Sequence, residues 1–115
     1  MNTLAIETIA ATAKSVAVTD DTLTVDLSDG RSLAVPLDWF PRLIHATRAE
    51  RKHWRLIGRG RGIHWDLLDE DISIDGLLAG RPSGESQASF QKWLAARQRT
   101  RGNRVTARKA YSRRS

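Results

Sequence analysis

Hydrophobic and polar residues alternate with a period of two from residue 16 to residue 37. The apolar positions are Val16 and Val18, then Leu23, Val25 and Leu27, then Leu33, Val35 and Leu37. This alternation is typical of strands that bury one face. The turn sequences Asp20-Asp21 and Ser28-Asp29-Gly30-Arg31 separate the three runs. The pattern therefore predicts an antiparallel meander, and Pro36, which has no N–H to donate, favours an edge position for the third strand.

The apolar spacing becomes helical after residue 37. Trp39, Phe40 and Leu43 follow a helix-like spacing, and Pro41 suits the first turn of a helix. Thr47, with a glutamate three residues later, matches a capping box, which predicts a second short helix through about residue 53.

The next segment returns to strand-like patterns. Strands are predicted at residues 54–57 and 63–65, joined by a glycine-rich turn at 58–62. Ile72 and Ile74 have strand spacing, and a brief helix ends at Gly80. Together the segments predict an α+β domain, with a small antiparallel meander sheet and short helices, over residues 1–80.

Residues 81–96 are predicted to form a linker followed by a C-terminal helix. Phe90, Trp93 and Leu94 fall near one face of that helix, and serines before it can cap its start. Phe90 and Trp93 are accordingly the candidate partner-binding residues. Residues 97–115 are too polar to bury a core of their own, which predicts a disordered, arginine-rich tail.

Charge divides the chain sharply. Residues 81–115 contain ten Lys or Arg and one acid, Glu85, whereas residues 1–80 contain nine bases and twelve acids. A basic segment of this kind can neutralise phosphates and release counterions, so nucleic acid or another polyanion is the expected partner. A solvated tail without a partner is the alternative. The candidate nucleic-acid-binding residues are Arg97, Arg99, Arg101, Arg104, Arg108, Lys109, Arg113 and Arg114.

No residue pattern specifies a reaction. The chain contains no cysteine, which excludes disulfides and thiolate chemistry. The glycines at 58–62 lack the lysine and serine or threonine of a phosphate-binding loop. The carboxylates Asp66, Asp69 and Asp71 with His64 suggest a metal-dependent enzyme only as a remote alternative to a solvated acidic loop. We therefore expect a non-enzymatic protein with no cofactor and no metal.

No signal sequence or membrane-spanning apolar run is evident, so a cytoplasmic protein that does not contact membranes is expected. A core built from about 80 residues is small. A protein partner or a dimer interface would add to the buried surface.

Several segments resemble the domain of unknown function 2442 family over roughly residues 15–80. The resemblance is carried by 27–31 with 35–37, by Trp39-Phe40-Pro41-Arg42-Leu43, and above all by Gly62-Ile63-His64-Trp65 with the residues 68–73 and 76–80 that follow. Many relatives have proline where this chain has Asp66.

The resemblance implies a small bacterial or phage α+β domain without an established activity. It also implies a gene often placed beside another small uncharacterised protein, and some relatives carry a helix-turn-helix after this domain. Two hypotheses follow. The first is a binding or regulatory module whose arm contacts a polyanion, and the second is an antitoxin-like domain that binds a small partner protein encoded nearby.

Overall fold

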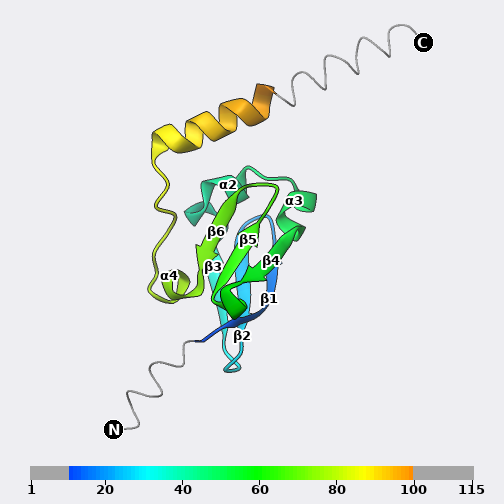
Figure 1. Cartoon of the computed structure of the whole chain (residues 1–115), viewed down its shortest axis with the longest axis vertical. Coiled ribbons are helices and arrows are strands. Elements are labelled where there is room, and N and C mark those ends of the chain that lie inside the picture. The colour runs from blue at the N-terminus through cyan, green and yellow to red at the C-terminus, as the bar shows by residue number, and fades with distance from the viewer. Residues whose placement is uncertain (1–10, 100–115) are drawn as a thin grey trace, which may run out of the picture. The chain divides into compact units, whose positions relative to one another are not determined.

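A computed structural model describes residues 11–99 of the chain (Figure 1). The chain divides into two units, Met1–Gly84 and Glu85–Ser115. The first unit, called the body below, extends four residues beyond the predicted boundary at residue 80. Backbone hydrogen bonds hold this extension, because Arg81 N donates to Gly76 O at 2.9 Å and Ser83 N donates to Trp39 O at 2.9 Å.

The first sheet is the predicted meander. It contains β1 (Ala13–Val18), β2 (Thr22–Leu27) and β3 (Ser32–Pro36), which pair antiparallel in chain order. The register aligns Val16 with Val25 and Val25 with Leu33, so the alternating apolar residues share one face. Pro36 ends an edge strand, as its missing donor requires.

The second sheet contains β4 (Trp54–Ile57), β5 (Gly62–Trp65) and β6 (Glu70–Ser73), again antiparallel and in chain order. The predicted strands at 54–57 and 63–65 are thus confirmed. The strand assignment of Ile74 is wrong, because this residue begins α4 (Ile74–Leu78). Ser73 caps that helix by accepting a hydrogen bond from Gly76 N at 2.9 Å, and this local bond stops the strand.

Short helices connect the two sheets. The 3-10 turn η1 (Leu37–Trp39) leads into α2 (Pro41–Ile44), which has proline in its first turn as predicted, and α3 (Arg48–Lys52) follows. Both bonds of the predicted capping box are present, since Glu50 N donates to Thr47 Oγ1 and Thr47 N donates to Glu50 Oε1. The α+β class is confirmed.

The glycine-rich segment is the connection between β4 and β5. It forms the single turn η2 (Gly58–Gly60), in which Arg59 has φ 58° and Gly60 has φ 85°. A β-carbon on Gly60 would lie 3.0 Å from Ala13 O, so this turn packs closely against the start of β1. The turn interpretation of residues 58–62 is therefore confirmed.

One hydrophobic core fills the body. In Figure 1 the green strands of the second sheet lie in front of the blue and cyan strands of the first, and each sheet contributes side chains that are wholly or almost wholly buried. The completely buried ones are Leu23, Val25, Leu37, Leu43, Ile63, Trp65 and Leu68. Trp65 is the largest of them, and its burial makes β5 the centre of the second sheet's packing.

The second unit contains a helix at residues 87–99. It extends past the predicted end at residue 96, because the Ala, Arg and Gln residues that follow Leu94 are good helix formers. Arg97 and Arg99 are therefore helical rather than part of a disordered tail. None of the helices within residues 11–99 has the length and apolar content needed to cross a membrane.

Candidate functional site

The basic arm, defined as residues 81–115, is described only in its first part. Of the predicted nucleic-acid-binding residues, Arg97 and Arg99 lie in the helix at 87–99, and Arg99 is exposed. The others lie outside the described residues: Arg101, Arg104, Arg108, Lys109, Arg113 and Arg114. The candidate site can thus be described at its helical beginning.

Planar side chains line one face of this helix. The rings of Phe90 and Trp93 stack with centroids 5.8 Å apart and an interplanar angle of 28°. The guanidinium carbon of Arg97 lies over the Trp93 ring, 5.1 Å from its centroid, at the distance of a cation–π contact. Phe90 is buried, whereas Trp93 and Arg97 are partly exposed. The two predicted partner-binding residues are therefore in contact with each other.

Polar side chains cap the N-terminal end of the same helix. Ser86 Oγ accepts a hydrogen bond from Ser89 N at 3.1 Å, as a helix cap does, and Ser89 Oγ donates to Glu85 Oε2 at 2.7 Å. The acid thus lies at the N-terminal end of the helix, where its charge complements the helix dipole and helps the helix to form within a polar segment.

A row of charged side chains crosses the outer face of the second sheet. Arg55, His64 and Asp71 are cross-strand neighbours on β4, β5 and β6, and Asp66 lies just after β5. His64 Nδ1 contacts Asp71 Oδ1, and His64 Nε2 contacts Asp66 Oδ1 at 2.9 Å. Arg55 Nε donates to Asp66 Oδ2 at 3.1 Å.

His64 lies between the two carboxylates of this row. Both ring nitrogens of His64 face carboxylates, and a neutral ring can donate from only one of them, so both contacts are hydrogen bonds only in the doubly protonated ring. Asp69 lies in the following turn with φ 49°. Among residues 11–99 no group of three or more His, Asp or Glu side chains is arranged to hold a metal ion.

We expect Asp66 to contribute to acid unfolding. The hydrogen bond from Arg55, and then the charges of Arg55 and His64, lower the pKa of Asp66 below its ordinary value of 3.8. A lowered folded-state pKa stabilises the body above the unfolded-state value, and the gain is lost as the pH falls through the folded-state pKa. In thermal melts, Asp66→Asn should therefore flatten the fall in Tm between about pH 5 and pH 2.

Arg55→Met tests the same pair from the other side, because it removes the principal cause of the lowered pKa of Asp66 and keeps the carboxylate. It should flatten the same part of the profile. An acid profile that neither substitution changes would contradict the role given to this pair.

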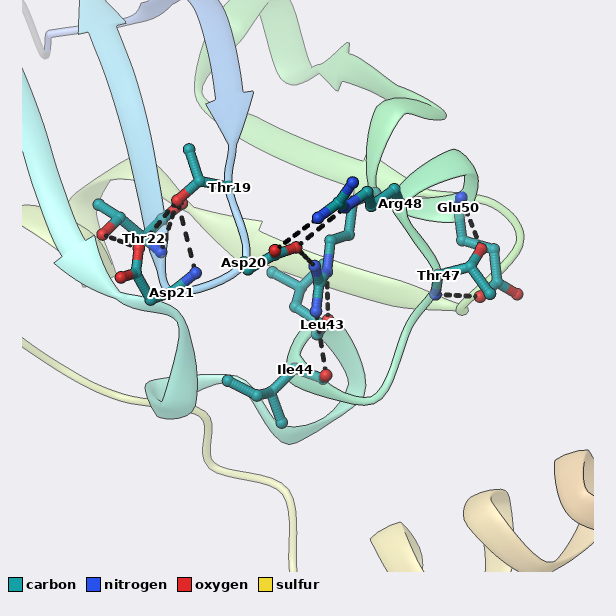
Figure 2. A network of polar contacts seen from close by, with 10 residues as sticks. Thr19, Asp20, Asp21, Thr22, Leu43, Ile44, Thr47, Arg48 and Glu50 are labelled. Atoms are coloured by element: carbon teal, nitrogen blue, oxygen red, sulfur yellow. Dashed lines mark hydrogen bonds and ion pairs between the residues drawn. The ribbon is translucent and has the colours of Figure 1, made fainter.

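A buried arginine joins the first sheet to both short helices. Arg51 on α3 is 7% exposed. Its Nε donates to Leu43 O at 2.9 Å and its Nη2 to Ile44 O at 3.0 Å, so it satisfies carbonyls at the end of α2. Its Nη1 donates to Asp20 Oδ1 at 3.0 Å. Figure 2 shows Asp20, in the turn between β1 and β2, with its carboxylate directed toward Arg48 of α3.

The exposed Arg48 pairs with the same carboxylate. Its Nη2 donates to Asp20 Oδ2 at 2.9 Å, as Figure 2 also shows. Hydrogen bonds from Arg48 and then from Arg51 hold the pKa of Asp20 below its ordinary value. Trp65 Nε1 completes the network by donating to Arg51 O at 3.0 Å. This network ties the turn between β1 and β2 to α2, α3 and β5.

The fold and the charge distribution define a class: a small α+β domain of two antiparallel meanders followed by a basic arm that begins with a helix. Residues 13–83 match the model of the family described as "Protein of unknown function (DUF2442)". The chain belongs to this family, as its sequence resemblance indicates.

Two solved structures are similar to the chain. A crystal structure of a protein of unknown function from Rhodospirillum rubrum ATCC 11170 shares 28% identity at a TM-score of 0.58, covering 70% of this chain and 98% of that one. A solution NMR structure of the uncharacterized protein CV0863 from Chromobacterium violaceum shares 24% identity at a TM-score of 0.58, covering 84% of each chain. The second likeness shows the fold alone. No curated protein matches the chain.

The family match ends one residue before the last residue of the body. Residues 84–115, which contain nine of the arm's ten Lys or Arg, therefore lie outside the segment that defines the family. The family match supplies only the fold of the body.

Proposed function

We propose that this chain is a non-enzymatic binding module whose basic arm contacts nucleic acid or another polyanion. The observation that supports the proposal is the concentration of ten Lys or Arg and one acid in residues 81–115. The body carries an excess of acids, so it would be repelled by the same partner. Binding should therefore depend on the arm and fall steeply with salt.

The helix at 87–99 supports this proposal further. The only acid of the arm, Glu85, lies before the helix and accepts a hydrogen bond from Ser89, while Lys92 and Arg99 are exposed. The helix thus presents basic side chains to solvent, and the acid of the arm lies just before its N-terminal end. A phosphate chain approaching residues 92–99 would meet positive charge.

Removing three charges from the arm tests the proposal. In the full chain, the triple substitution of Arg104, Arg108 and Lys109 by Gln should reduce the slope of log K against log salt by about 3. Affinity for a labelled duplex in about 0.1 M salt should fall by roughly 100-fold. Fluorescence anisotropy on DNA and RNA duplexes across salt measures both quantities.

The matched control removes the same number of charges from the exposed surface of the body, by substituting Lys14, Lys52 and Arg59 with Gln. It should bind as the unaltered chain does. Equal losses in both triple variants would mean that net charge alone matters, and a lack of binding by the unaltered chain would reject the proposal.

An antitoxin-like protein-interaction domain is the second candidate. The apolar face formed by Phe90, Trp93 and Leu94 favours it, because a helix with such a face suits a groove on a protein partner. A pull-down with the full chain from its native host, with and without nuclease, separates the candidates. A partner retained after nuclease treatment supports this one, and material lost on treatment supports the first.

A further inference from the structure

We propose that Trp93 is a stacking site for an unpaired base, so that the preferred polyanion is a single-stranded nucleic acid. This inference rests on the proposed function, because it assigns the partner class of the same arm. The structural observation behind it is the column of planar groups formed by Phe90, Trp93 and Arg97.

The column already holds a planar cation where a base would lie. The guanidinium of Arg97 is flat and delocalised, and it lies 5.1 Å from the Trp93 ring centroid. Unpaired bases stack on aromatic rings in the same manner. A base that takes this place displaces Arg97, whose charge is then available to the phosphate of the same nucleotide. The exchange replaces a cation–π contact with a base stack and an ion pair.

Phe90 fixes the orientation of the stacking ring. Phe90 is 7% exposed, and its ring stacks on Trp93 with an interplanar angle of 28°. A ring held in this way loses little side-chain freedom on binding, which favours stacking. Trp93 itself is partly exposed, so a ligand can reach it from solvent.

Charge and exposure select Trp93 among the four tryptophans. Trp65 is completely buried in the core. Trp39 and Trp54 are partly exposed but belong to the body, which carries more acids than bases. Trp93 is followed by eight Lys or Arg within residues 97–115. An aromatic ring beside a run of basic residues is the combination that binds single-stranded nucleic acid, because the nucleobases of a duplex stack on one another and leave no face for the ring.

An oligonucleotide without bases separates stacking from charge. The full chain should bind a 12-nucleotide deoxythymidine strand about 10-fold more tightly than an abasic strand of the same length. Trp93→Leu should bring this ratio close to one while leaving the affinity for the abasic strand unchanged. Trp93→Phe, which keeps an aromatic ring, should retain most of the preference. Fluorescence anisotropy at fixed salt measures each ratio.

The matched control is Leu94→Ala, which shortens an apolar side chain next to Trp93 and keeps a good helix former. It should leave the ratio unchanged. An unchanged affinity of Trp93→Leu for the abasic strand shows that the substitution leaves the arm intact. If that affinity falls, the ratio measured with Trp93→Phe provides an independent test.

Three results would overturn the inference. They are a ratio of one in the unaltered chain, equal losses in Trp93→Leu and Leu94→Ala, and binding to phosphatidylglycerol vesicles in place of either strand. Equal binding of both strands rejects stacking and leaves the proposed polyanion function standing. Absence of binding to both strands and to duplexes rejects the two together.

Discussion

Replacing Arg51 by Met should lower the free energy of unfolding by about 3 kcal/mol, because charge-assisted hydrogen bonds are lost and acceptors are left unsatisfied in a buried site. The carbonyls of Leu43 and Ile44 lose their donors, and methionine fills the space without replacing them. For a body of this size the loss corresponds to a fall in Tm of roughly 15 °C. Urea and thermal unfolding, followed by circular dichroism, measure it.

Arg48→Met is the matched control, because Arg48 pairs with the same carboxylate of Asp20 from an 81% exposed position. Exposed ion pairs stabilise proteins little, so this variant should show only a small fraction of the loss. Arg51→Lys should resemble Arg51→Met, since an ammonium cannot reproduce the planar fork that reaches three acceptors. Similar losses at positions 48 and 51 would show that the pairing with Asp20, and not the buried carbonyls, carries the stability.

Truncating Trp65 to Ala should cost about 3–5 kcal/mol, the range observed for large aromatic side chains in cores. The side chain is completely buried, and its Nε1 donates to Arg51 O. Domains of this size are stabilised by roughly 4–12 kcal/mol in total. The variant should therefore lose a large part of the body's stability, with a sharply lowered urea midpoint and Tm.

The cross-strand neighbour of Trp65 provides the control. Trp54 on β4 is paired with Trp65 in the register of the second sheet, but its side chain is partly exposed. Trp54→Ala should lose less than half as much stability. Trp65→Phe keeps most of the buried surface and removes the hydrogen bond, so it should fall between the two. A loss at Trp54 equal to that at Trp65 would contradict the assignment of the core.

Local patterns predicted most of the fold. The period-two alternation around Val25 gave the meander, and the spacing of Thr47 and Glu50 gave both bonds of a capping box. Each feature depends on residues within a few positions of one another. Ile74 was misassigned because two isoleucines at strand spacing outweighed the capping serine between them.

The buried network could not be read from the sequence. Arg51 stands in a run of charged residues, and nothing next to it indicates burial. Its partner Asp20 is 31 residues away, and its other acceptors are backbone carbonyls, which carry no sequence signal. The contacts of Asp66 with Arg55 and His64 depend likewise on the register of the second sheet. In the arm, helical spacing brought Phe90, Trp93 and Arg97 together, but the charge count alone indicated no base-stacking site.

The order of the strands has a consequence for how the body folds. Within the described residues, every strand pairs only with the strand next to it in sequence, so each sheet closes short loops at a small entropic cost. The long-range step is the meeting of the two meanders, which both contact Arg51 of α3: Asp20 accepts a hydrogen bond from its side chain, and Trp65 donates one to its backbone carbonyl. Low contact order favours rapid folding. Each sheet can therefore form from its own strands before the two sheets pack together.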